Sequence, residues 1–284
     1  MSSVPHARPA RRQPARARAY TVFRFCAIGV VVVTILGPLL WMILAALKDN
    51  VDIFNSSRIF SFAPTLKNFV TVFAEESFLD FIVNSLLVGA VSTVISLAVA
   101  LPASYSISRF VMRRSKTFVL VARIMPAVSL LVPWYFLFSR MGIVGSYTVL
   151  VITHMFVSVP LMIYILVGFF DGLPLELEES GQVDGLTPIG AFLRISVPLS
   201  MPGVATACIL AFIFSWNNFL FALVLASNST RTLPLSLYNF VRYASVDWGG
   251  LMAASVVITT PIIVIALFLQ RYIVAGLAAG ATKG

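Results

Sequence analysis

Residues 173–202 read LPLELEESGQVDGLTPIGAFLRISVPLSMP and separate two long apolar segments of the chain. The stretch is acidic near its start and is interrupted by glycine and proline, whereas the segments on either side carry almost no charge. Glu176, Glu178 and Glu179 place negative charge at the start of a short helix, where the helix dipole favours it. We therefore predict a polar helical hairpin over residues 171–198, which we call the acidic loop.

Two short helices are predicted within the acidic loop. Gly185 suits the left-handed conformation that ends the first helix. Thr187 is an N-cap candidate for the second, and Pro188 suits its first helical position. Apolar residues then recur at helical spacing until Pro198, which is expected to end the helix. An apolar face outside the membrane needs a partner surface, and this one offers Leu186, Ile189, Phe192 and Leu193.

The composition requires a membrane protein. The chain has 284 residues, of which 59% are apolar and only 11% charged, so one soluble domain of this size has too few polar side chains for its surface. A membrane-spanning helix needs about 20 apolar residues. Six windows satisfy this length and predict an all-α, polytopic fold without a second domain: 22–47, 80–107, 117–139, 147–170, 199–226 and 248–271.

The net charge of +9 reflects topology rather than nucleic-acid binding, because the basic residues lie in short connections between spans. With both termini in the cytosol, the positive-inside rule is satisfied. The run from Phe25 to Leu47 is too long for the core of a signal peptide, which favours a retained first span over a cleaved leader. The cytosolic side then receives 13 of the 20 basic residues: Arg8, Arg11, Arg12, Arg16, Arg18, Arg24, Arg109, Arg113, Arg114, Lys116, Arg194, Arg271 and Lys283.

The acidic loop resembles the cytoplasmic EAA loop in the membrane subunits of bacterial ABC importers. In that loop an acidic residue, two small residues, a glycine and a late Ile-x-x-Pro recur at fixed spacing. The chain departs from the common pattern in having Ser-Gly where Ala-Ala is usual, and a mid-helix glycine costs roughly 1 kcal/mol relative to alanine. The matching positions are Glu179, Ser180, Gly181, Gly185, Ile195 and Pro198, with Asp184 as in the sugar-importer branch.

Further motifs carry the resemblance over residues 20–284. The Asn84-Ser85 pair and the string Ala63–Phe69 are similar to the same family. The ending after span six, residues 270–284, is very close to that of one of the two paired permeases of carbohydrate importers, the maltose-permease-like second subunit. The resemblance implies that this small-residue tail contacts the ATPase pair, through Gly276, Gly280 and Lys283, although a frayed end is the simpler alternative.

The family implies a type I ABC importer fold and a set of partners. These are a second permease subunit in a heterodimer, two nucleotide-binding ATPase subunits that hold ATP and Mg, and an extracytoplasmic substrate-binding protein. The implied division is a disordered basic tail (1–19), a first span with an external segment (20–79), a transmembrane domain (80–271) and a cytoplasmic tail (272–284). The residues implied to couple to the ATPase are Glu178, Glu179, Ser180, Gly181, Asp184, Gly185, Ile195 and Pro198.

No motif for chemistry on a substrate is found in the sequence. A phosphate-binding P-loop requires Gly-x-x-x-x-Gly-Lys-Ser/Thr, and none of the lysines follows a glycine. The two histidines, His6 and His154, are far apart, and Cys26 and Cys208 lie in predicted spans without metal-ligand spacing. We therefore expect no catalytic residue, no metal and no cofactor in this chain.

The substrate path is expected to use aromatic and amide side chains within the spans, because sugars are held by ring faces and a few hydrogen bonds. The same amides could instead join helices to one another. Arg123 is expected to extend back to the cytosolic surface, with a role in the path as the alternative. The candidates are Trp134, Tyr135, Tyr164, Trp216, Asn217 and Asn218.

The sequence favours an importer permease for a mono-, di- or oligosaccharide, in the bacterial inner membrane. Only Arg123 offers basic lining, which favours a neutral sugar over glycerol phosphate, although that substrate or another polyol remains an alternative. An ion-gradient-driven secondary transporter is a rival, but it would need carboxylates at mid-membrane, and here they lie in connections or at span ends. A membrane-anchored scaffold without transport is a second rival.

Overall fold

The computed structural model describes residues 15–74, 78–110, 112–241 and 245–281, and no β-strand is found among them. Four helices are long and apolar enough to cross a membrane, and two bent helix pairs raise the number to as many as six. The helices are α1 Ala15–Ala46, α2 Asn50–Ile53, η1 Ser56–Arg58, α3 Lys67–Ala74, α4 Phe78–Arg109, α5 Arg113–Ile124, η2 Ala127–Leu130, α6 Leu131–Arg140, α7 Tyr147–Asp171, α8 Glu176–Val183, α9 Pro188–Ala191, η3 Phe192–Ser196, α10 Val197–Leu199, α11 Met201–Trp216, α12 Leu220–Leu225, η4 Leu233–Phe240 and α13 Trp248–Ala281.

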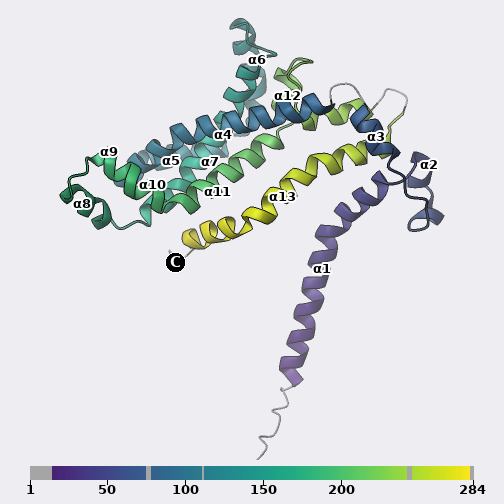
Figure 1. Ribbon diagram of the computed structural model, residues 1–284, viewed down its shortest axis with the longest axis horizontal. Helices are drawn as coiled ribbons and strands as arrows, with labels where there is room; N and C mark the ends of the chain where they lie inside the picture. The colour runs from purple at the N-terminus through teal and green to yellow at the C-terminus, as the bar shows by residue number, and fades with distance from the viewer. Residues whose placement is uncertain (1–14, 75–77, 111, 242–244, 282–284) are drawn as a thin grey trace, which may run out of the picture.

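Helices α4, α7, α11 and α13 form a bundle that carries the core (Figure 1). Small residues allow the helices to approach closely, as membrane helices require. A Cβ atom at Gly203 of α11 would collide with the ring of Phe169 on α7, and one at Gly89 of α4 would lie 2.9 Å from the ring of Phe212. One buried cluster joins α4, α7 and α11: Ala100, Met162, Leu166, Phe170, Ala207 and Ala211.

Figure 1 shows α1 leaving this bundle, with α8 and α9 at the opposite end of the molecule from α2 and α3. None of the most apolar part of α1 is buried against the rest of the chain, although its last turns pack near α13. We call the end with α8 the loop end. Helix α1 begins at Ala15, inside the tail predicted for residues 1–19, and residues 1–14 lie outside the described part.

Two predicted spans are broken, which corrects the uninterrupted spans 117–139 and 199–226. In the first, the halves Arg114–Ile124 and Ala127–Arg140 meet at 85°. Met125 there has an extended conformation, with ψ 126°, because the following Pro126 disfavours a helical predecessor. The second ends its long helix at Trp216, and it is also bent by 74° between α10 and α11.

The Asn84-Ser85 pair fastens α4 to the segment between α12 and α13. The Asn84 amide donates to the carbonyls of Ser229 (3.0 Å) and Arg231 (2.9 Å), and its oxygen accepts from the Tyr147 hydroxyl at 2.7 Å. The Ser85 hydroxyl accepts from the Leu233 backbone N–H at 2.7 Å. The pair therefore joins α4 to this segment through hydrogen bonds, at the end of the bundle opposite the loop end.

The helix of the last span continues beyond residue 271, where the predicted span ends, although its membrane-spanning candidate is Trp248–Phe268. Helix α13 reaches Ala281, so residues 272–281 of the predicted C-terminal tail are helical. Gly276 and Gly280 belong to this helix, and Lys283 lies outside the described residues. The contact of the three residues with an ATPase stays a prediction.

Candidate functional site

The acidic loop forms the two short helices that the sequence predicts. Gly185 adopts φ +94°, and the following N–H, of Leu186, bonds to the Gly181 carbonyl at 2.9 Å, as at a helix end of the Schellman type. The Thr187 hydroxyl caps the next helix by accepting from the Gly190 N–H at 3.1 Å. The predicted turn at Gly185 and the cap at Thr187 are therefore confirmed.

The predicted helix end at Pro198 is wrong. Residues Phe192–Ser196 form a π-helical turn, and Pro198 lies inside the next helical segment, Val197–Leu199. Proline has no N–H to donate and its ring crowds the carbonyl four residues earlier, that of Arg194. A wider turn avoids this clash, so the helical path continues until the bend at Ser200.

Glu178 is the buried centre of the loop, with only 3% of its surface exposed. Its carboxylate accepts from the Tyr105 hydroxyl at 2.6 Å and from Nε of Arg109 at 2.8 Å, both on α4. It also accepts from the Ser196 hydroxyl at 2.8 Å. Arg109 donates in addition to the carbonyl of Phe170 at 3.1 Å. One carboxylate thus joins both halves of the acidic loop to α4, while the arginine that binds it also holds the end of α7.

The surroundings of Glu178 keep it ionised. Burial by itself would raise the pKa of this carboxyl, but hydrogen bonds from Arg109, Tyr105 and Ser196, together with the charge of Arg109, outweigh burial and hold the pKa below its ordinary value. The sequence alone did not indicate this pairing. Arg109 and Glu178 are 69 residues apart, and in the sequence Arg109 is recognisable only as a cation at the end of a span.

A second ion pair closes the base of the acidic loop. Lys116 of α5 lies 2.8 Å from the Asp171 carboxylate, at the end of α7. The Ser108 hydroxyl of α4 donates to the same carboxylate at 2.6 Å. Three helices therefore converge on Asp171, which directly follows Phe170, the residue whose carbonyl accepts from Arg109. The loop thus leaves the bundle from a fixed point.

Gly181 and Ile195, two of the residues matched to the EAA pattern, meet inside the loop. Gly181 is buried, and a Cβ atom there would overlap Cδ1 of Ile195. The small residue at this position therefore allows α8 to approach the π-helical turn of the same chain. Ser180 is exposed, and its hydroxyl donates to the Glu176 carbonyl.

Replacing Gly181 by valine is expected to loosen the acidic loop, because overpacking costs about 1–3 kcal/mol. The measurement is the rate at which a protease cleaves the loop in the purified protein. Gly168→Val is the control, since nothing lies within 4 Å of a Cβ there. The double variant Gly181→Val/Ile195→Ala should recover resistance, and a double variant that is cleaved as fast as Gly181→Val would contradict the packing argument.

The most exposed apolar side chains of the loop are Val183 (88% exposed), Ile189 (71%) and Leu193 (55%). Phe192, which was predicted to share this face, instead packs on the Tyr105 ring at 4.6 Å. Leu186 is half-buried. The face available to a partner is therefore narrower than the periodicity suggests, and we call Val183, Ile189 and Leu193 the apolar tip.

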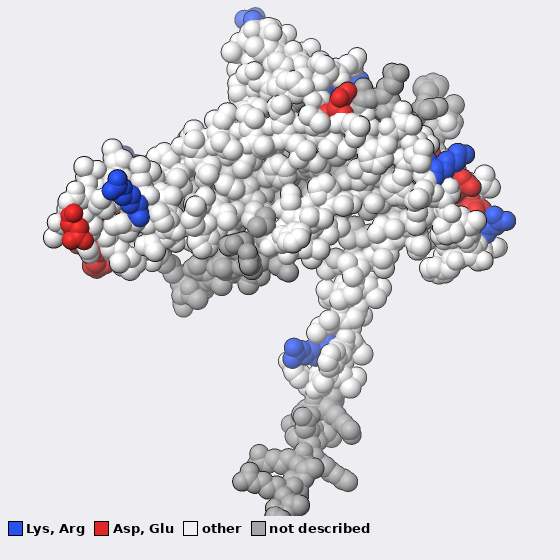
Figure 2. Space-filling view, in the orientation of Figure 1, with Lys and Arg blue, Asp and Glu red and all other residues white. Residues whose placement is uncertain are grey.

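Acidic side chains lie beside the apolar tip. Glu176, Glu179 and Asp184 are all exposed, and Figure 2 shows acidic side chains gathered at the loop end. The adjacent glutamates therefore differ in environment, since Glu178 is buried against α4 whereas Glu179 faces outward. This arrangement, an apolar tip with a partly acidic rim on a fixed base, suits a protein contact.

The structure separates the residues predicted to line a substrate path. Tyr135 and Tyr164 are 47% and 50% exposed, whereas Trp134 packs against Phe156 with ring centroids 4.9 Å apart. Trp216, by contrast, is 1% exposed in the core and donates its indole N–H to the Ile258 carbonyl at 3.1 Å. Trp216 was predicted to line the substrate path, but it lies on the inner face of α11, where its indole packs against α13.

The two asparagines act on the backbone at the break in the fifth span. Asn217 is exposed and donates to the Ile213 carbonyl at 3.0 Å. The Asn218 side chain accepts from the Phe221 N–H at 3.1 Å and so caps α12. Asparagine favours such local bonds over a continuing helix. The pair thus explains why α11 stops at Trp216.

A family model described as the inner membrane component of binding-protein-dependent transport systems matches residues 92–278. The chain belongs to this family. The permease is 34% identical to the trehalose transport system permease protein SugB of Mycobacterium tuberculosis, over 87% of its own length and 92% of that protein. It is 32% identical to the sulfoquinovosyl glycerol transport system permease protein SmoH of Agrobacterium fabrum, over 92% and 93%.

Its fold is that of an ABC importer membrane subunit. A chain of the bacterial ABC transporter that imports the acidic polysaccharide alginate superposes with a TM-score of 0.76, at 16% identity, over 93% of the permease and 99% of that chain. Family and fold together make the permease a multi-pass protein of the inner membrane and a transport subunit rather than a catalytic one.

Proposed function

We propose that the permease forms half of a sugar pathway and is driven through its acidic loop by a separate ATPase. The sugar is a mono-, di- or oligosaccharide, in keeping with the relatives named for trehalose and for sulfoquinovosyl glycerol. ATP and Mg would be bound by two copies of the ATPase subunit. A second permease would complete the pathway, and an extracytoplasmic binding protein would deliver the sugar.

The observation that carries this proposal is the contrast between the two ends of the acidic loop. Its outer end exposes the apolar tip, which is free in this chain, whereas its base is joined to α4 through the buried Glu178. A partner that moves the tip would therefore move α4 as well. In this proposal the loop end and both termini are cytoplasmic, and the exposed Glu179 makes a charged contact with the ATPase.

Charge reversal at Glu179 tests the coupling. Glu179→Lys should lower uptake by about fivefold or more, since one intermolecular charge pair is worth about 1 kcal/mol or more, while ATP hydrolysis continues. Uptake and hydrolysis would be measured together in proteoliposomes that hold both permeases and both ATPases, with the binding protein supplied. The control is Asp49→Lys, which reverses an exposed carboxylate at the other end of the molecule.

The same vesicles show which energy source drives uptake. Uptake by the wild-type complex should require ATP and should persist when ionophores remove proton and sodium gradients. Uptake that follows an ion gradient without ATP would reject the proposal in favour of a secondary transporter. Normal uptake by Glu179→Lys would reject the assigned role of that residue.

A further inference from the structure

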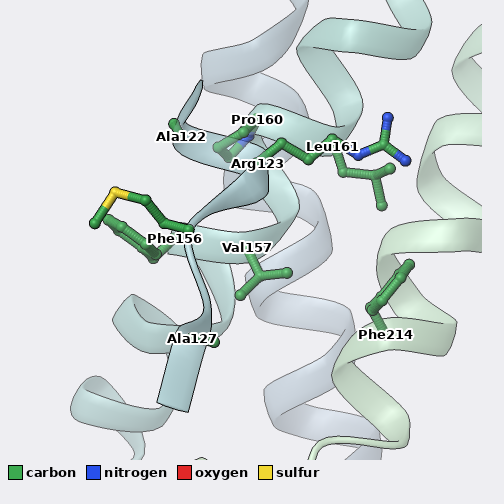
Figure 3. Close-up of a pocket in the computed structure, with 9 residues that line it drawn as sticks. Ala122, Arg123, Ala127, Phe156, Val157, Pro160, Leu161 and Phe214 are labelled. Carbon is green, nitrogen blue, oxygen red and sulfur yellow. The ribbon is translucent and has the colours of Figure 1, made fainter. Parts of the chain in front are cut away.

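The break in the third span opens a cavity beside it. The cavity holds about 140 Å³ and lies between the end of α5, the middle of α7 and α11. Figure 3 shows Phe156 and Phe214 on opposite sides of it, with Val157 between them and the Arg123 side chain extending along one wall. Most of its lining is apolar and aromatic, and Arg123 supplies the one charge among the lining residues.

Arg123 stays deep in the span instead of reaching its end. Its guanidinium lies over the Tyr164 ring, 4.7 Å from the centroid. Tyr164 is seven residues before Asp171, the end of α7, or about 10 Å along the helix axis. In the described part of the chain no ion pair includes Arg123, as the pairs there join Arg58 to Asp52, Arg109 to Glu178 and Lys116 to Asp171.

Two physical constraints indicate that this region faces water or substrate and not lipid. A cation at this depth is costly unless it lies in a cavity or meets a counter-charge. Non-helical backbone at membrane depth is likewise tolerated only where protein buries it or where it lines a water-filled cavity. Arg123, which has no ion-pair partner among the described residues, and Met125, whose backbone is extended, lie two residues apart and both line this cavity. The cavity therefore accommodates both the cation and the non-helical backbone.

We infer that this cavity is a substrate subsite for a sugar that carries one carboxylate or sulfonate group. The inference rests on the proposed transport function. The guanidinium offers paired N–H donors that match two oxygens of such a group, and the rings of Phe156 and Phe214 offer apolar faces to the sugar ring. When the pathway closes, an anionic sugar neutralises Arg123, whereas a neutral sugar leaves the cation desolvated and unpaired.

The subsite replaces the preference for a neutral sugar that the scarcity of basic residues suggested. A single arginine is enough to bind one anionic group of the sugar, because no other group of the described chain forms an ion pair with it. Complete ligand pockets usually exceed roughly 300 Å³, so the cavity of about 140 Å³ receives a single sugar ring with its acidic group. The rest of the substrate would lie against other parts of the pathway.

The test measures direct binding by saturation-transfer NMR, which detects weak ligands. The sample is the complete transporter in nanodiscs, without the binding protein. The probes are the methyl glycosides of glucose, galactose and mannose and the three corresponding methyl glycosiduronic acids. We expect at least one of the acids to bind more tightly than its neutral counterpart. Arg123→Gln should weaken that acid by about tenfold or more, as expected for lost charge-assisted hydrogen bonds, and should affect the neutral glycoside much less.

Arg140→Gln is the matched control, because the Arg140 guanidinium also lies over an aromatic ring, that of Phe136 at 4.3 Å, but at the far end of α6. It should leave binding of the acid unchanged. Arg123→Lys keeps the charge and loses the paired donors, so it should retain part of the affinity. Equal binding of all three acids and their neutral counterparts, or an acid whose affinity does not change in Arg123→Gln, would overturn the inference.

ATP-driven uptake by the same complex separates this failure from failure of the proposed function. A complex that imports a sugar with ATP but shows no Arg123-dependent binding of an acid overturns the subsite alone. The alternative occupant, a carboxylate of the second permease paired with Arg123, would also appear as absence of acid binding. A complex that imports no sugar removes the basis of both proposals.

Discussion

Replacing Arg109 by alanine should abolish sugar uptake while the protein still inserts in the membrane. The substitution leaves the Glu178 carboxylate buried without its cation, and breaking a buried pair in this way costs about 3–5 kcal/mol. Loss of Arg109 removes a hydrogen bond and a positive charge that both lower the pKa of Glu178, so this pKa rises. Uptake and ATP hydrolysis in proteoliposomes, with the protease sensitivity of the acidic loop, measure the effect.

The control for this experiment is Arg114→Ala, which removes an exposed arginine at the same end of the bundle. The double variant Arg109→Ala/Glu178→Leu removes both members of the pair and should be less damaged than Arg109→Ala, because no buried charge is left alone. If the double variant is as damaged as the sum of the two single variants, Glu178 and Arg109 act independently and the proposed joint does not exist.

Replacing Ile189 by aspartate should prevent the permease from holding its ATPase. Ile189 is 71% exposed on the apolar tip, and a partner that covers it would have to bury the new carboxylate without a counter-charge. An apolar anchor of this kind is worth about 2 kcal/mol or more, so affinity should fall by about 30-fold or more. The measurement is the amount of ATPase that co-purifies, followed by titration of purified ATPase onto nanodisc-bound permeases.

Val51→Asp is the matched control, since Val51 is an apolar side chain that is 82% exposed at the opposite end of the molecule. It should leave the ATPase bound. Unchanged ATPase binding by Ile189→Asp would mean that the apolar tip is not the contact, whatever the phenotype in uptake.

Much of the fold could be predicted because the signals are local. Apolar length predicted where the spans lie, and the turn at Gly185 and the cap at Thr187 follow from the backbone preferences of single residues. The broken spans were missed because an apolar window counts hydropathy only. Pro126 and the pair Asn217 and Asn218 were visible in the sequence, and their preference for non-helical neighbours was the available signal.

The centre of the site could not be predicted in the same way. The bond between Glu178 and Arg109 depends on how α4 and α7 pack, and one sequence contains no direct record of that distance. The sequence also could not distinguish the buried Glu178 from the exposed Glu179, which are neighbours with the same chemistry. An aromatic ring such as that of Trp216 suits a sugar-binding path, but it fills a core equally well, so the sequence alone does not separate the two.

The contacts of Glu178 also determine how stiffly the loop is mounted. A flexible stalk would absorb a push at the tip by bending, and little displacement would reach the membrane. Here hydrogen bonds to Tyr105, Arg109 and Ser196 connect α8, the π-helical turn and α4 through one side chain. The acidic loop and α4 should therefore move as one rigid unit. The displacement that reaches the bundle then depends on the length of the loop and not on bending within it.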